Sequence, residues 1–187
     1  MSERTIRYLN IVYFISQMLT IIGFMLRKEY GSAFNPIATS FFYLGIVLGE
    51  RFTEYKLKNY IRIILIITLT GHSLIGEYFH AYHKSVYFDK ALHVFGTFSF
   101  SLFAYDLFIN FIEIKTSRPV IFTFILVSLM GIWLGTFFEL VEFSLDLIFK
   151  ENNQNGLLDT DLDLLCDLIG ALLAGFFAVK SRNIILK

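Results

Sequence analysis

Long apolar stretches separated by short polar segments form the dominant pattern along this chain. Six stretches predict membrane-spanning helices, because a span needs about 20 mostly apolar residues. They cover residues 8–26, 33–49, 61–80, 91–112, 120–139 and 164–179, and the helical pattern of the fifth continues to Phe149. The pattern therefore predicts an all-α, polytopic integral membrane protein, a six-helix transmembrane bundle that forms a single domain over residues 1–187.

The composition agrees with a membrane-embedded chain. Hydrophobic residues make up 56% and charged residues 17%, whereas soluble domains have roughly 45–50% and about 25%. The formal net charge is zero, so no charge excess indicates a nucleic-acid partner. The single Cys166 excludes an internal disulfide. The expected partner is membrane lipid, and the sequence indicates no oligomeric state.

Lysine and arginine are distributed unequally between the two sides of the predicted bundle. Eleven of the 16 lie in the two termini and in the segments after the second and fourth spans. Because such residues accumulate in cytoplasmic segments, both termini are predicted to be cytoplasmic.

Ionisable residues of four spans are predicted at one level of the membrane. Counting about 1.5 Å per residue from each cytoplasmic anchor places His72 near the middle of the membrane and brings the others to its outer third: Glu77, His80, His93, Glu139, Asp163 and Asp167. Charges at that depth are costly unless they face the bundle interior, pair or bind a cation. The level is therefore a candidate functional site.

Helical spacing places these residues on common faces. The spaced sets are Asp89 with His93, Glu139 with Glu142 and Asp146, and Asp163 with Asp167, Gly170 and Ala174. Small residues on the last stripe favour close approach of a neighbouring helix. Carboxylates and imidazoles from separate helices are the ligands of divalent metals in helix bundles. The same groups could instead relay protons.

Other interpretations of these residues remain open at this point. Thr160 to Asp163 fits a helix-start signal, which would make Asp161 and Asp163 capping residues. Glu142 and Asp146 could project into water, and Lys90 could form a structural ion pair with a nearby acid. His80 and His83 fit a wet interface, and Asp106 fits a packing role.

Three motifs, in order, carry a family resemblance. They are Phe88-Asp89-Lys90 followed by His93, Phe138-Glu139-Leu140-Val141-Glu142-Phe143, and Asn155-Gly156 leading through Asp159–Asp163 to Ile169-Gly170-Ala171. Over about Ile61–Gly175 the chain resembles the YjdF-like inner-membrane family, which is similar to VanZ-like proteins. The resemblance implies the bacterial cytoplasmic (inner) membrane and groups six residues as one site: Asp89, His93, Glu139, Glu142, Asp159 and Asp163. It names no reaction, and Asp167 departs from the small or amide residue of relatives.

The first functional hypothesis is a metal-dependent enzyme that acts on a lipid or lipid-linked headgroup at the outer leaflet. The predicted ligands of a divalent ion are Asp89, His93, Glu139 and Asp163. Glu142 is the candidate base, and His93 could also carry protons. His72, Glu77, Asp146, Asp159 and Asp167 complete the polar site. A transporter coupled to ions or protons and a non-catalytic scaffold are the alternatives.

Overall fold

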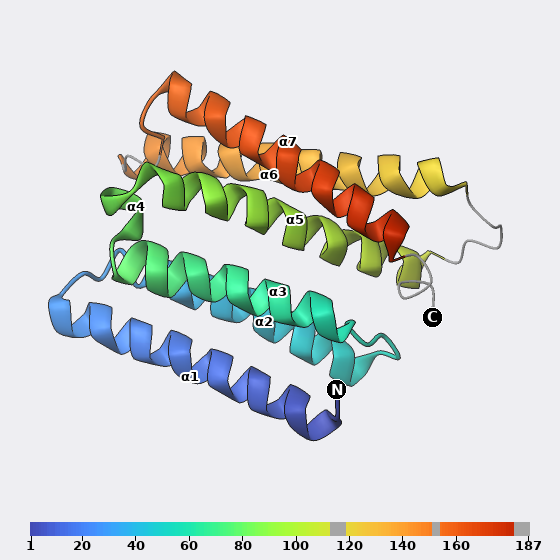
Figure 1. The fold of residues 1–187 in the computed structure, drawn as a ribbon. Coiled ribbons are helices and arrows are strands. Elements are labelled where there is room, and N and C mark those ends of the chain that lie inside the picture. Colours follow the sequence, from blue (N-terminus) through green and yellow to red (C-terminus); the bar gives the residue numbers. More distant parts are fainter. Residues whose placement is uncertain (113–118, 151–153, 182–187) are drawn as a thin grey trace. The chain divides into compact units, whose positions relative to one another are not determined.

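The computed structural model describes residues 1–112, 119–150 and 154–181, and within these ranges the chain is helical, with no strand (Figure 1). The elements are α1 (Glu3–Arg27), α2 (Phe34–Phe52), α3 (Asn59–Thr70), the π-helix η1 (Gly71–Tyr78), α4 (Ala81–Lys84), α5 (Val86–Phe111), α6 (Val120–Phe149) and α7 (Leu157–Lys180). The all-α prediction is confirmed for the described residues.

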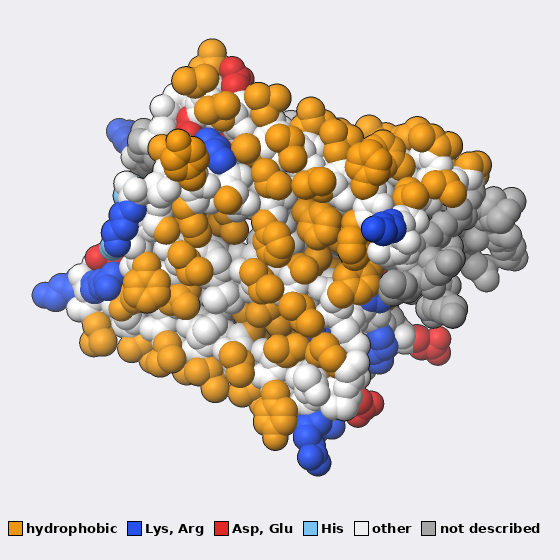
Figure 2. Space-filling model, viewed as in Figure 1, with side chains coloured by type: hydrophobic (Ala, Val, Ile, Leu, Met, Phe, Trp, Pro, Cys, Tyr) orange, Lys and Arg blue, Asp and Glu red, His pale blue; other side chains and the backbone are white. Residues whose placement is uncertain are grey.

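Five segments have the length and apolar character of membrane spans: Glu3–Arg27, Asn59–Tyr78, Val86–Phe111, Val120–Ile148 and Leu157–Lys180. The predicted second span forms α2, a 19-residue helix that carries Glu50 and Arg51 just before its last residue, Phe52. This helix is not among the segments that are apolar enough to cross a membrane. Figure 2 shows apolar side chains spread over the visible surface, as expected where lipid replaces water. The chain is an integral membrane protein, and its six-span count remains a prediction.

Contacts divide the chain into two compact units, Met1–Asp89 and Lys90–Lys187, and the boundary falls inside α5. In the N-terminal unit, the buried stripe of α1 consists of Tyr13, Gln17, Thr20 and Phe24. Tyr13 packs on Tyr43 of α2 with ring centroids 4.5 Å apart, and Phe24 packs edge-on against Tyr78 of η1. These contacts join α1, α2 and η1.

The C-terminal unit packs α5, α6 and α7 closely because small residues line their contacts. A side chain on Gly170 of α7 would meet the carbonyl oxygen of Val94 at 2.3 Å. On α6, a side chain on Gly131 would meet Ala171 at 2.6 Å, and one on Gly135 would meet Asp167 at 2.6 Å. The predicted close approach along the Gly170 stripe is thus present, and it brings polar groups of three helices together.

Several helix boundaries differ from the sequence prediction, and two of them concern candidate site residues. Helix α7 begins at Leu157 after Gly156, whose φ of 110° favours glycine. Asp163 therefore lies in the second turn, and its interpretation as part of a helix start at Thr160 is wrong. The predicted third span to His80 ends as η1 at Tyr78, and His80 has a φ of 58°. The continuation of α6 to Phe149 is confirmed.

Candidate functional site

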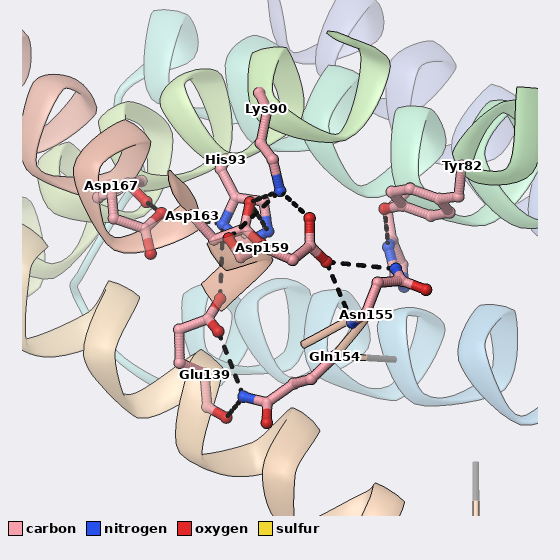
Figure 3. Close-up of polar contacts among 11 residues, drawn as sticks. Tyr82, Lys90, His93, Glu139, Gln154, Asn155, Asp159, Asp163 and Asp167 are labelled. Atoms are coloured by element: carbon pink, nitrogen blue, oxygen red, sulfur yellow. Dashed lines mark hydrogen bonds and ion pairs between the residues drawn. The ribbon is translucent and has the colours of Figure 1, made fainter. Parts of the chain in front are cut away.

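The polar groups of the C-terminal unit gather around His93 of α5 (Figure 3). Its Nδ1 lies 3.2 Å from Oδ1 of Asp167 and 3.9 Å from Oε1 of Glu139. Its Nε2 lies 3.4 Å from Oδ1 of Asp163. The imidazole therefore lies between carboxylates of α6 and α7, and we call His93, Glu139, Asp163 and Asp167 the carboxylate–histidine cluster.

The members of this cluster are shielded from solvent. The side chains of Asp163 and Asp167 are each 4% exposed, Glu139 is 5% and His93 is 14% exposed. Burial of a carboxylate without a counter-charge or hydrogen bonds is strongly unfavourable. The partners of each carboxyl oxygen therefore decide whether the cluster is complete.

Two carboxyl oxygens of the cluster lack a hydrogen-bond partner among the described residues. Oδ1 of Asp167 accepts from the Thr97 hydroxyl at 2.5 Å, but its Oδ2 is buried without a partner. Oε2 of Glu139 accepts from the Gln154 amide at 3.4 Å, but its Oε1 is buried without a hydrogen bond. Such orphaned buried acceptors indicate an unfilled interaction.

Lys90 is the cation beside the cluster. Its Nζ lies 2.6 Å from Oδ1 of Asp159 and 2.7 Å from Oδ1 of Asp163. Asp159 also accepts from the backbone and side-chain amides of Asn155, each at 3.2 Å. Asp159 thus holds the start of α7 in an ion pair, as the structural interpretation of Lys90 predicts, whereas Asp163 is shared between Lys90 and His93.

Glu142 extends the cluster along α6. One ligand atom from each of His93, Glu139 and Glu142 lies within 4.8 Å of the other two. Ligand atoms on opposite sides of Mg²⁺ or Ca²⁺ are about 4–5 Å apart. The three side chains can therefore reach one ion with small rotations.

The remaining predicted site residues have the following places. Asp146 accepts from the backbone N–H of Gln154 at 2.9 Å and so fastens the segment after α6. Asp89 lies one turn before His93 on α5, and one ligand atom from each of Asp89, His93 and Asp163 lies within 4.8 Å of the other two. His72 and Glu77 lie on η1 in the N-terminal unit, where Nδ1 of His72 is 2.6 Å from the Tyr82 hydroxyl.

Two contacting residues were missed by the sequence analysis. Thr97 follows His93 by four residues, so the helical spacing could have identified it. Gln154 follows the last residue of α6 by five positions and reaches both the backbone carbonyl and the side chain of Glu139. A residue in a connecting segment has no periodic signal, and only the fold shows its position.

Comparison with known proteins gives one family and one distant relative. A family described as "Predicted membrane protein (DUF2238)" matches residues 8–183. An "Uncharacterized protein" of Thermotoga maritima is 33% identical over 125 residues, which cover 65% of this chain and 62% of that protein. The match thus spans less than two thirds of the relative's length. No solved structure matches the chain. Since the family match covers both units and the whole cluster, the chain belongs to this family of membrane proteins.

Proposed function

We propose that this protein binds a divalent cation at the carboxylate–histidine cluster and uses it to act on the headgroup of a membrane lipid or lipid-linked substrate. The observation that carries the proposal is a pair of buried oxygens that have no hydrogen-bond partner among the described residues, Oε1 of Glu139 and Oδ2 of Asp167, on two helices that both contact His93. The ligand atoms that lie within 4.8 Å of one another, and so could hold the cation beside these oxygens, belong to His93, Glu139 and Glu142 and to Asp89, His93 and Asp163.

The charges in this region support a cation. Glu139, Asp159, Asp163 and Asp167 supply four carboxyl groups, against one ammonium group on Lys90 and one imidazole on His93. When all four carboxyl groups are ionised and Lys90 is charged, the net charge is −3 with a neutral His93 and −2 with a protonated His93. A cluster of this sign in a low-dielectric bundle is stabilised by a divalent ion or by taking up protons. The cation and the proton are therefore the two occupants to compare.

The residues can be assigned roles in hydrolysis. A divalent ion polarises a phosphoryl or ester oxygen and lowers the pKa of bound water. His93, Glu139, Asp163 and Asp167 are the proposed ligands, and Asp89 is a further predicted ligand on the same helix as His93. Glu142 is the proposed base, because it is half-buried and within ligand distance of Glu139 and His93. Lys90 keeps Asp163 oriented through their ion pair.

The proposal includes the topology predicted from the sequence: six spans in one domain, cytoplasmic termini, and a site in the outer third of the bacterial cytoplasmic membrane. In this arrangement the cluster lies near the level of outer-leaflet headgroups. The similarity to VanZ-like proteins belongs to the same proposal. A reporter fused after Lys187 should report a cytoplasmic location, and a periplasmic signal would contradict the outward-facing site.

A carrier is the second candidate, and one observation in the N-terminal unit favours it. The span Asn59–Tyr78 changes from α3 to the π-helix η1 at Gly71, and π-helical segments are frequent at functional sites. Gln17 on the facing stripe of α1 is 1% exposed, and both its amide atoms lack a partner among the described residues. Ion flux in proteoliposomes tests this candidate.

The enzyme proposal is tested by turnover of headgroup-labelled phospholipids in proteoliposomes, with and without divalent cations. We expect label to be released only when a divalent cation is present. Glu142→Gln should release label at a rate about 10²-fold lower while the cation stays bound. Glu139→Gln should lose both cation binding and label release. Asp106→Asn is the matched control, because Asp106 is buried on α5 about 20 Å along the helix from His93. Bound cation without turnover would contradict the enzyme and favour a scaffold.

A further inference from the structure

A groove on the C-terminal unit is lined by Asp167, a member of the carboxylate–histidine cluster. It has a volume of about 490 Å³ and lies between α6, which contributes Ile132 and Thr136, and α7. Helix α7 contributes Asp161, Leu164, Leu165, Asp167 and Leu168. We call this the α6–α7 groove. Its volume is in the range of small-molecule sites.

The polarity of the α6–α7 groove changes along its length. Helices α6 and α7 are antiparallel (Figure 1), so Thr136 is toward the end that holds Asp161, and Ile132 is toward the end that holds Leu168. Asp161 and Leu168 are about 10 Å apart along α7. The end of the groove at Asp161 and Thr136 is therefore polar, and the end at Leu168 and Ile132 is apolar.

Asp167 connects this groove with the carboxylate–histidine cluster. Its Oδ1 contacts His93 and Thr97, while its Oδ2 lies 2.6 Å from the position that a side chain on Gly135 would occupy. Gly135 lies beside Thr136 and one helical turn from Ile132, both of which line the groove. Because Gly135 has no side chain, the buried Oδ2 of Asp167 packs directly against the backbone of α6 and has no hydrogen-bond partner among the described residues.

The charges of the groove limit the class of molecule that it can hold. Its ionisable lining residues are two acids, exposed Asp161 and buried Asp167. An anionic headgroup would be repelled, whereas an ammonium group would be attracted. Leu165 is 55% exposed and Leu168 is 38% exposed, so the apolar end is accessible to a lipid chain.

We propose that the α6–α7 groove binds a zwitterionic aminophospholipid, with one acyl chain along Leu165 and Leu168 and the ammonium group near Asp161. Through this groove, the lipid reaches the carboxylate–histidine cluster laterally from within the bilayer. Lipid binding stands on the groove itself, while its role as substrate entry rests on the proposed function. The substrate class becomes an amine-bearing phospholipid.

The test is photo-crosslinking of the full chain in nanodiscs with phosphatidylethanolamine that carries a diazirine on its acyl chain. We expect label on peptides containing Leu165 and Leu168, displaced by unlabelled phosphatidylethanolamine but not by phosphatidylglycerol. Leu165→Trp should reduce labelling about tenfold by filling the groove. Leu173→Trp is the matched control, because Leu173 is 48% exposed on the same helix and does not line the groove; its labelling should be unchanged.

The headgroup contact is tested separately with Asp161→Lys. This change should remove the preference for phosphatidylethanolamine and allow phosphatidylglycerol to compete. Equal competition in the unaltered protein, or equal loss of label with Leu165→Trp and Leu173→Trp, would overturn the groove proposal. Labelling is measured with a chelator present and again with added cation. Selective labelling without a bound cation would support the groove proposal and contradict the metal site. A bound cation without selective labelling would support the metal site and contradict the groove proposal.

Discussion

The two units of this protein each bury charged groups, but they do so with different charge balance. In the N-terminal unit, Arg62 is 1% exposed and pairs with Glu50 at 2.5 Å. Its guanidinium also donates to the Tyr43 hydroxyl at 3.2 Å and to Asn10 at 3.3 Å. One cation and one anion neutralise each other there, although Nε of Arg62 is buried without a hydrogen-bond partner among the described residues. The difference between the two sites is therefore one of charge.

The carboxylate–histidine cluster, taken together with Asp159 and Lys90 beside it, has no such balance. Four carboxyl groups share one lysine and one histidine, and two buried oxygens have no hydrogen-bond partner among the described residues. A neutral pair can stabilise a bundle by itself, but an excess of buried negative charge requires a cation or protons from outside. The comparison therefore fits a folding role for the first cluster and supports the proposal that the second binds a cation.

The largest expected effect is on the balanced pair. Arg62→Met leaves Glu50 charged and largely buried, so it should lower the free energy of unfolding by about 3–5 kcal/mol. Denaturant titration in detergent micelles measures this value. The double variant Arg62→Met/Glu50→Gln should recover a large part of the loss, and failure to recover would mean that Arg62 acts through packing instead of charge.

The second effect separates the two clusters by their response to added cation. A divalent ion at about 100 times its dissociation constant should raise the free energy of unfolding by about 2.7 kcal/mol. The gain should persist in Arg62→Met and disappear in Glu139→Gln. Thermal unfolding with increasing cation concentration measures both responses. Equal gains in the two variants would place the cation elsewhere.

The third effect concerns the space that glycine leaves above Asp167. Gly135→Ala should weaken cation binding about tenfold, because its side chain would crowd Oδ2 of Asp167, with a packing cost of about 1–3 kcal/mol. Gly131→Ala is the matched control, since it crowds Ser101 and Ala171 with similarly short contacts. Calorimetric cation titrations should show weaker binding for Gly135→Ala alone. Equal weakening would mean that general helix packing is responsible.

The smallest effect concerns Lys90. Lys90→Met removes the ammonium group that pairs with Asp159 and Asp163. It should destabilise the cation-free protein by about 1 kcal/mol, because Lys90 is partly accessible to solvent. It should also tighten cation binding a few-fold, because the negative excess increases. Weaker cation binding would instead show that Lys90 is needed to hold Asp163 in place.

Hydropathy and helical spacing predicted much of the C-terminal unit. Depth counting brought His93, Glu139, Asp163 and Asp167 to one level, and the structure places them in one cluster. The start of α7 was missed because Asp159, Asp161 and Asp163 interrupt the apolar pattern, although the ion pairs of Lys90 compensate two of these acids. The cost of a charge depends on its partners, which hydropathy does not include.

The N-terminal unit was less predictable. The π-helix η1 differs from an α-helix in its backbone hydrogen bonds, and side-chain periodicity gives little signal for this change. The ion pair of Arg62 with Glu50 joins residues 12 positions apart on different helices. Arg62 lies at the start of the predicted third span, where positive charge favours an exposed cytoplasmic position, and its burial is visible only from the packing of α2 and α3.

The most direct test of the unbalanced cluster is the metal content of the purified protein after loading with divalent cations and removal of unbound ions. The account predicts about one tightly held ion per chain, lost in Glu139→Gln and Asp167→Asn and retained in Asp106→Asn and Arg62→Met. Absence of bound ion in the unaltered protein, or equal content in all four variants, would contradict the assignment and leave protons as the occupants of the cluster.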